Sequence, residues 1–354
     1  MKVVRRTPDF RWVIVALLSV TACAPEPRWL AVGGATSIDV LAPGGTGDTL
    51  TNVGGTVIGA TGLISAVEFG PGGSSIYLGI THNTGSALAW INRTTGASLA
   101  RLQLPRDSLT TLRLLPDGRS LAVTTVSRGE SVAFESALHI IPTDLATFGA
   151  RIPLCSGVAV GLATHGVRDR MYAVCRGDEL VEIDRKLGVR VRSVQLSPDA
   201  GRLPCEAADL HTSANGSVVF VLCAGSGTLL YLDRVRLTPY DSLPVGTGGA
   251  RLARTPEGRY VAITRPSADE VVIVDVRQRR IAHRLPIEGA ADVTIGIDGR
   301  SAFVTAATAT QSRLYRVTLT TGAVVSQQLT ISDAHRVAVW PGPKSPKMRW
   351  RHQP

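Results

Sequence analysis

Lysine is scarce in this chain of 354 residues, where Lys2, Lys186, Lys344 and Lys347 stand among a much larger number of arginines. Aromatic residues make up only 5% of the sequence, and no basic run is interleaved with them. A nucleic-acid-binding protein usually shows a clustered basic patch or a recognisable motif. We therefore attribute the formal net charge of +10 to an arginine-rich composition and expect no nucleic-acid partner.

Motifs for catalysis and for cofactor binding are also missing. The chain has no Gly-x-Ser-x-Gly, no His-Glu-x-x-His, no P-loop and no dinucleotide-binding glycine pattern. It has no Cys-x-x-Cys pair, as many zinc sites require, and no Cys-x-x-Cys-His for covalent haem. The seven histidines show no metal-ligand spacing. We expect no metal and no cofactor, and the sequence identifies no catalytic residue.

Apolar runs long enough to cross a bilayer are absent too, because a transmembrane helix needs ~20 such residues. The run from Trp12 to Ala22 is shorter and follows a basic N-terminus, which is the layout of a signal peptide. It ends in Val20-Thr21-Ala22-Cys23, which resembles the bacterial lipobox. The resemblance implies that Cys23 is lipidated and becomes the mature N-terminus. An ordinary signal peptide cleaved nearby is the alternative.

Four segments are therefore expected along the chain. They are a lipoprotein signal peptide at 1–23, a tether at 24–28, a β domain at 29–342 and a basic, disordered tail at 343–354. Ala24, rather than Asp, follows Cys23, and among lipoproteins this favours the outer membrane. We expect an exported protein held by its N-terminal lipid on the periplasmic or cell-surface side of a membrane.

Internal repeats indicate the fold. Two β-rich runs joined by a turn that ends in glycine recur, with anchors at Gly73, Gly118, Gly166, Gly216, Gly258 and Gly299. The spacings are 45, 48, 50, 42 and 41 residues, which suits the blades of a β-propeller. Further runs, such as 270–275 and 280–285, complete four antiparallel strands per copy.

The repeat is clearest over about residues 205–306, within which residues 255–305 read TPEGRYVAITRPSADEVVIVDVRQRRIAHRLPIEGAADVTIGIDGRSAFVT. This segment resembles the YVTN-type repeat of bacterial surface and periplasmic seven-bladed propellers. The stretches 181–184 and 230–233 match the third strand of the same repeat. The resemblance implies an all-β propeller that binds a protein or a small polar ligand.

Closure of the ring sets the number of blades. Six copies cover residues 64–329, and an incomplete blade remains at each end. The run 335–340 can supply an inner strand, and 29–32, 38–41 and 56–58 can supply the other three. Joining them buries two exposed sheet edges. We therefore predict seven blades, one shared by the N- and C-terminal strands; six or eight blades are the alternatives.

Four cysteines besides Cys23 predict two disulfides. Pairing in a hairpin keeps the sum of opposed residue numbers constant, and this selects Cys155 with Cys175 and Cys205 with Cys223. Each pair is expected to face its partner directly across its own hairpin. Export provides the oxidising surroundings that disulfides need.

A candidate site follows from strand alternation, because the first strand of each blade lines the channel. Residues six before each anchor are apolar and should pack between blades. The residues expected to face the channel stand five or seven positions before each anchor glycine. Those five before are Glu68, Arg113, Gly161, His211, Ala253 and Thr294. Those seven before are Ala66, Thr111, Ala159, Asp209, Arg251 and Asp292, and the last strand adds Arg336. The candidate ligand-binding residues are Arg113, Asp209, His211, Arg251, Asp292 and Arg336.

Two interpretations of this channel remain open. The arginines Arg113, Arg251 and Arg336 could bind an anionic or polyhydroxylated ligand. Alternatively, they pair with Glu68 and the aspartates in a water-filled structural channel.

Three functions are consistent with the sequence, because fold alone does not determine function. The first is a non-enzymatic binding platform for a protein or ligand. The second is an enzyme or redox partner, since similar propellers occur in lactonases and amine-dehydrogenase-like subunits. The third is an envelope assembly factor.

Overall fold

The computed structural model describes residues 30–43, 50–57, 62–105, 107–128, 134–143, 149, 151–164, 169–196 and 203–340. The expected signal peptide, Cys23, the tether and the basic tail lie outside the described residues. Among those that are described, no helix has the length and apolar character needed to cross a membrane.

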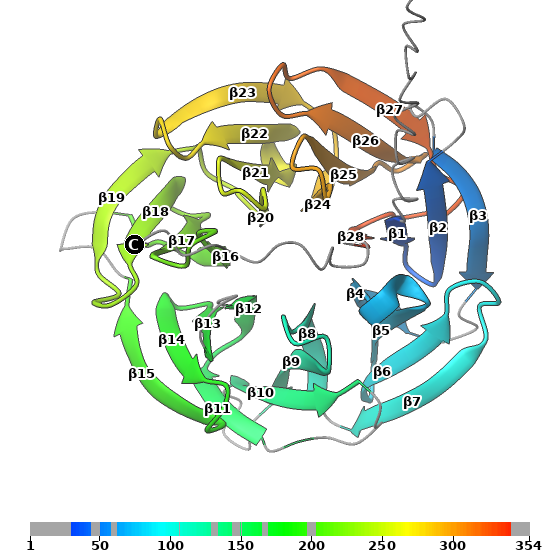
Figure 1. The fold of residues 1–354 in the computed structure, drawn as a ribbon, viewed down its shortest axis with the longest axis horizontal. Coiled ribbons are helices and arrows are strands. Elements are labelled where there is room, and N and C mark those ends of the chain that lie inside the picture. Colours follow the sequence, from blue (N-terminus) through cyan, green and yellow to red (C-terminus); the bar gives the residue numbers. More distant parts are fainter. Residues whose placement is uncertain are drawn as a thin grey trace, which may run out of the picture.

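Seven four-stranded antiparallel sheets form a ring around a central channel, which confirms the seven-bladed propeller (Figure 1). Blade 1 is made by β28 (Arg336–Val339), β1 (Leu30–Gly33), β2 (Ser37–Pro43) and β3 (Leu50–Val57). Blade 2 is β4 (Leu63–Phe69), β5 (Ser75–His82), β6 (Gly85–Asn92) and β7 (Ser98–Pro105). Blade 3 is β8 (Asp107–Leu114), β9 (Ser120–Arg128), β10 (Phe134–Pro142) and β11 (Arg151–Ser156).

The remaining blades follow the same order from the inner to the outer strand. Blade 4 is β12 (Ala159–Thr164), β13 (Arg170–Cys175), β14 (Glu179–Asp184) and β15 (Val189–Gln195). Blade 5 is β16 (Ala207–Thr212), β17 (Val218–Cys223), β18 (Thr228–Asp233) and β19 (Pro239–Pro244). Blade 6 is β20 (Arg251–Arg254), β21 (Tyr260–Arg265), β22 (Glu270–Asp275) and β23 (Arg280–Pro286). Blade 7 is β24 (Ala290–Ile295), β25 (Ser301–Ala307), β26 (Ser312–Thr318) and β27 (Val324–Gln328).

Blade 1 closes the ring as predicted. Strand β28 pairs antiparallel with β1, with Leu30 opposite Val339 and Gly33 opposite Arg336. Figure 1 shows the red C-terminal strand beside the blue N-terminal one. The chain ends therefore meet within one sheet, and blade counts of six and eight are excluded.

The turns explain the anchor glycines. Gly118, Gly216, Gly258 and Gly299 have φ angles between 64° and 73°, in the left-handed region that glycine adopts without strain. Short 3-10 segments, η1 (Pro71–Gly73) and η2 (Pro266–Ala268), occupy two other turns. These turns reverse the chain between adjacent strands of one blade.

The hydrophobic core lies between neighbouring blades. One cluster joins Tyr77 and Trp90 of blade 2 to Leu112 and Val123 of blade 3. Most of the apolar residues predicted to pack between blades are buried, as Leu112, Leu210 and Leu252 illustrate, but Val160 is only half-buried. Since the middle strands bury both faces, each blade is held by the two beside it.

Side-chain hydrogen bonds from the third strand of one blade reinforce many junctions. Ser86 Oγ accepts from the backbone N–H of Leu109 in the next blade, at 2.9 Å. The same contact joins Ser136 to Ala159, Asp178 to Ala207, Asp269 to Gly289, and Ser312 to Ala334. A short polar residue at the start of the third strand thus satisfies an N–H group near the start of the next inner strand.

Both predicted disulfides form, but one has a different placement from that expected. Cys155 lies on β11, the outer strand of blade 3, and Cys175 lies on β13 of blade 4. The bond therefore links two blades instead of crossing one hairpin. Strand β12 begins only at Ala159, which is the residue that faces Cys175. The numbering argument selected the right pair but assumed that the hairpin extends four residues too far.

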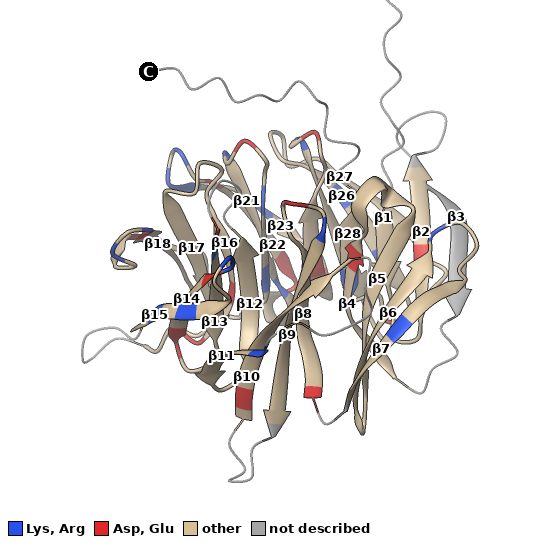
Figure 2. Ribbon diagram, turned by 60° about the horizontal axis from the view of Figure 1, so that its bottom comes forward, with Lys and Arg blue, Asp and Glu red and all other residues tan. Residues whose placement is uncertain are grey.

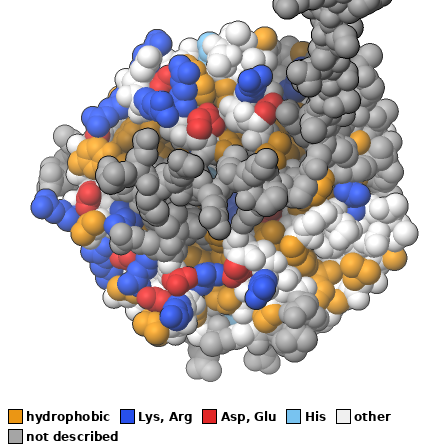
Figure 3. Space-filling view, in the orientation of Figure 1, with side chains coloured by type: hydrophobic (Ala, Val, Ile, Leu, Met, Phe, Trp, Pro, Cys, Tyr) orange, Lys and Arg blue, Asp and Glu red, His pale blue; other side chains and the backbone are white. Residues whose placement is uncertain are grey.

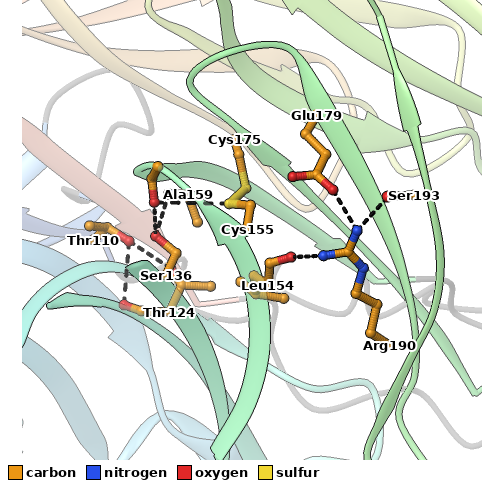
Figure 4. The surroundings of a disulfide bond; sticks show 11 residues. Thr110, Thr124, Ser136, Leu154, Cys155, Ala159, Cys175, Glu179, Arg190 and Ser193 are labelled. Carbon is orange, nitrogen blue, oxygen red and sulfur yellow. Dashed lines mark hydrogen bonds and ion pairs between the residues drawn. A yellow bond between two sulfur atoms is a disulfide. The ribbon is translucent and has the colours of Figure 1, made fainter. Parts of the chain in front are cut away.

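Other contacts at the junction of blades 3 and 4 surround this disulfide (Figure 4). The Arg190 guanidinium donates to the Leu154 carbonyl oxygen and to the Glu179 carboxylate, both at 2.5 Å. Ser136 Oγ accepts from Ala159 N at 2.8 Å. The second disulfide stays within blade 5, where Cys205 precedes β16 and Cys223 ends β17.

Candidate functional site

All six predicted ligand-binding residues line one cavity at the centre of the ring. Its volume is about 240 Å³. The contributing residues are Arg113 on β8, Asp209 and His211 on β16, Arg251 on β20, Asp292 on β24 and Arg336 on β28. Figure 2 shows basic and acidic segments on the strands in the middle of the molecule. The six residues selected by strand alternation therefore share one cavity, and their role in binding a ligand stays a prediction.

A β-bulge in the inner strands determines the direction of these side chains. The pairing register shifts immediately before Ala66, Thr111, Gly161, Asp209 and Asp292. A β-bulge of this kind increases the local twist and redirects the residue beside it. The shift recurs at the same place in five blades, so these positions are structurally equivalent.

This equivalence corrects the position in blade 4 that was obtained by counting back from the anchor glycine. The residue opposite Val174 is Gly161, just as Asp209 is opposite Leu222 in blade 5. Gly161, not Ala159, therefore holds the equivalent position. A Cβ atom at Gly161 would lie 2.8 Å from Asp209 Oδ1, so glycine allows the two inner strands to approach.

The Asp209 carboxylate connects blades 5 and 6. Its Oδ1 accepts from the N–H of Leu210 at 2.8 Å, and its Oδ2 accepts from the N–H of Leu252 at 3.0 Å. Asp209 is only 3% exposed. Burial raises its pKa, and Arg251 and Arg113 act in the opposite direction. The side chain therefore satisfies backbone groups that the edge strands would otherwise leave unpaired.

Asp292 repeats this arrangement two blades further on. Its Oδ1 accepts from Val293 N at 2.9 Å, and its Oδ2 accepts from Val337 N at 3.1 Å. Val337 belongs to β28, so this contact also ties the closing blade to blade 7. Both aspartates serve as bridges between inner strands.

Glu68 in blade 2 acts in a related way one step further along the channel. Its carboxylate interacts with the backbone N–H groups of Leu114 in blade 3 and of Phe69 beside it. Burial raises the pKa of Glu68 to about 7, although Arg113 and these N–H groups favour the charged form. Glu68 therefore changes charge near neutral pH.

Two of the three arginines are directed at backbone carbonyls. Arg336 donates from Nε to Ser65 O at 2.6 Å, and from Nη1 to the carbonyl oxygen of His335 at 2.8 Å. Arg251 reaches across to Val160 O at 3.2 Å. Burial lowers the pKa of Arg336, and the nearby Arg251 lowers it further.

Arg113 and His211 make fewer hydrogen bonds than the other channel residues. The Arg113 side chain is exposed in the channel and makes no hydrogen bond or ion pair with the described residues. His211 Nδ1 lies 3.1 Å from the backbone N–H of Thr212. Burial, together with Arg254 and Arg113, lowers the pKa of His211 to about 3, so its ring is neutral at physiological pH. The channel thus offers a guanidinium group that is available to a ligand.

Two further residues line the cavity that the sequence did not name as candidate ligand-binding residues. Thr111 lines the cavity and is 7% exposed, and its buried hydroxyl has no hydrogen-bond partner among the described residues. Arg254 also lines the cavity and donates to the Thr255 and Pro256 carbonyls. Thr111 belonged to the channel set, but nothing in the sequence showed that its hydroxyl lacks a partner.

A larger space of about 840 Å³ adjoins this cavity and shares with it Ser65, Thr110, Arg251 and Arg336. Within the described part of the chain, no three His, Cys, Asp or Glu side chains are grouped so that they could hold a metal ion. The channel can therefore provide positive charge and hydrogen-bond donors to a small polar molecule.

Charged side chains outside the channel are distributed unevenly. In the view of Figure 3 they gather over blades 4 to 6 and are sparse over blades 1 and 2. Ion pairs such as Arg192–Glu182 and Arg265–Glu270 belong to the charged region. Both pairs are partly buried, since the Glu182 and Glu270 side chains are mostly covered.

Comparisons with known proteins support the fold and give no family. No family model matches the chain, and no curated protein matches it. A chain in the solved structure titled "Crystal Structure of Mitotic Checkpoint Complex" is similar, with a TM-score of 0.60 and 9% sequence identity. The match covers 77% of this chain and 78% of that chain. At such low identity, the similarity shows a shared propeller architecture.

Proposed function

We propose that this protein is an exported, lipid-anchored propeller that acts as a non-enzymatic platform for a protein partner. The proposal depends on one observation: most charged side chains in the channel hydrogen-bond to the backbone of the ring. Asp209, Asp292 and Arg336 hydrogen-bond to backbone groups, mostly of neighbouring blades, so they hold the ring together. The outer surface of the ring is then the part available to a large partner.

Two further observations support this proposal. The similar solved chain belongs, by its title, to a protein complex, and a rigid ring offers a broad surface for such contacts. The Cys155–Cys175 and Cys205–Cys223 bonds are compatible with an oxidising compartment outside the cytoplasm. The lipobox-like Val20–Cys23 stretch supports anchoring by an N-terminal lipid.

Anchoring is tested with Cys23→Ser. The variant should lose labelling by radioactive palmitate and leave the membrane fraction, whereas Cys155→Ser should keep both properties. Membrane retention and normal processing of Cys23→Ser would contradict the lipobox interpretation.

The platform function is tested by crosslinking in intact membranes, followed by mass spectrometry. A reproducible partner whose crosslinks map to the outer strands is expected. Crosslinks confined to the channel mouth, or turnover of a lactone or amine substrate by the purified protein, would favour the enzyme alternative.

A further inference from the structure

The channel carboxylates follow a spacing of two blades. Asp209 stands in blade 5 and accepts from N–H groups of blades 5 and 6. Asp292 stands in blade 7 and accepts from N–H groups of blades 7 and 1. The next position in this series falls in blade 2, where the equivalent residue is Ala66. Blades 2 and 3 therefore have no carboxylate at this position, although Glu68 accepts from N–H groups of the same two blades two residues further along their strands.

The N–H groups at this third position belong to Val67 and Leu112. Val67 is opposite Leu78 on the adjacent strand, as Leu210 is opposite Val221 in blade 5. In an antiparallel sheet, alternate residues of an edge strand direct their N–H groups to the same side. Two residues further on, the N–H groups of these same two strands reach the Glu68 carboxylate in the channel. The Val67 and Leu112 N–H groups therefore face the channel as well.

Other donors surround these N–H groups. Val67, Leu112 and Arg113 all line the 240 Å³ cavity. The Arg113 guanidinium interacts electrostatically with Glu68 and Asp209 but makes no hydrogen bond with the described residues. The Thr111 hydroxyl, buried and without a partner there, lies beside them in the sequence and lines the same space. A water molecule occupies about 30 Å³ of liquid, so the cavity can hold a small molecule with several waters.

We propose that a small carboxylate binds between β4 and β8, in the place that an aspartate side chain takes in the other two pairs of blades. Its two oxygens accept from the N–H groups of Val67 and Leu112, and one of them also accepts from Arg113. Bidentate acceptance of this kind suits a carboxylate because the same geometry already exists at Asp209. The proposal does not depend on lipid anchoring or on the partner-binding function.

The first test supplies the carboxylate from the chain itself. Ala66→Asp should raise the thermal unfolding midpoint of the full-length protein by roughly 2–5 °C, because two N–H groups gain a charged acceptor. Ala66→Asn is the matched control: its size is similar, but its single acceptor oxygen carries no charge, and no such rise is expected. A lower midpoint for Ala66→Asp than for Ala66→Asn would overturn the proposed geometry.

The second test uses acetate as the probe, with sodium chloride exchanged for sodium acetate at constant ionic strength. Acetate should raise the wild-type unfolding midpoint in a concentration-dependent way. Ala66→Asp should show no such response. Arg113→Lys keeps the charge but loses the planar donor pair, and should need roughly tenfold more acetate for the same shift.

Titration calorimetry measures the same binding without unfolding the protein. Saturable heat from acetate with the wild type, and its absence with Ala66→Asp, would support the site. An identical response to chloride, or binding of inorganic phosphate but not acetate, would refute a carboxylate site.

Discussion

The two sides of the channel hold their inner strands together by different chemistry. Around blades 5, 6, 7 and 1, the buried Asp209 and the half-buried Asp292 bridge the backbones of adjacent strands. Around blades 2, 3 and 4, the equivalent positions carry Ala66, Thr111 and Gly161. There Glu68 links blades 2 and 3 from a different position, and a disulfide joins the outer strand of blade 3 to the second strand of blade 4. Adjacent blades of the ring can therefore be linked by different kinds of interaction.

The largest effect is expected from opening the junction that both sides share. Deleting residues 333–354 removes β28, exposes the edge of β1 and uncovers part of the core. We expect loss of cooperative unfolding in circular dichroism melts. Deleting residues 344–354 leaves β28 in place and should melt close to the wild type; equal behaviour of the two truncations would contradict closure by β28.

Removal of an aspartate bridge should have the next largest effect. Asp209→Ala leaves the N–H groups of Leu210 and Leu252 without their acceptor, and should lower the free energy of unfolding by about 2–4 kcal/mol. Denaturant titration measures the change. Thr294→Ala alters the same cavity without removing a bridge and serves as the control. If both variants lose equal stability, the bridging role is wrong.

The disulfide side can be weakened separately. Replacing Cys155 and Cys175 together by Ala should cost about 3 kcal/mol, the value expected for a closed loop of 20 residues. Hydrogen exchange should accelerate in β11 and β12, while β24 and β28 stay protected. Peptide mapping of the wild type under non-reducing conditions checks the pairing itself, and a Cys175–Cys223 bond would contradict it.

The last effects depend on pH and reach their full size only in part of the pH range. Because the folded-state pKa of Glu68 is raised from 4.5 to about 7, its stabilising contribution is complete below pH 4.5 and is lost as pH rises through 7. Glu68→Gln should therefore gain stability relative to the wild type between pH 5 and pH 8, by at most about 3 kcal/mol.

His211 provides the opposite slope. Its folded-state pKa is lowered from 6.5 to about 3, so its contribution is complete above pH 6.5 and falls on acidification. His211→Gln should gain stability relative to the wild type near pH 5 and show no gain at pH 8. Parallel curves for wild type and either variant would mean that the group does not titrate in this range.

The sequence predicted the fold well because its signals are local and repeated. Turns ending in Gly118 or Gly258 and alternating β-runs define blades, and two incomplete ends can only be completed by each other. Alternation, which depends on a single strand, also selected six residues that line one cavity. Contacts between blades were harder to predict: the Cys155–Cys175 pair was expected, but its position between two blades was not, and the hydrogen bond from Leu252 to Asp209 does not follow from the pairing of any one hairpin.

Closure through blade 1 also has a consequence for the order of synthesis. Leu30 is among the first residues of the domain to be made, and its partner Val339 is among the last. At about 5–20 residues per second, the ribosome needs roughly 15–60 s to make the chain between them. During that interval the apolar edge of β1 has no inner-strand partner, and it can pair wrongly with another nascent chain. The first blade to be started is thus the last to be finished. A chaperone that binds the unpaired edge of β1 until β28 is made would favour correct assembly.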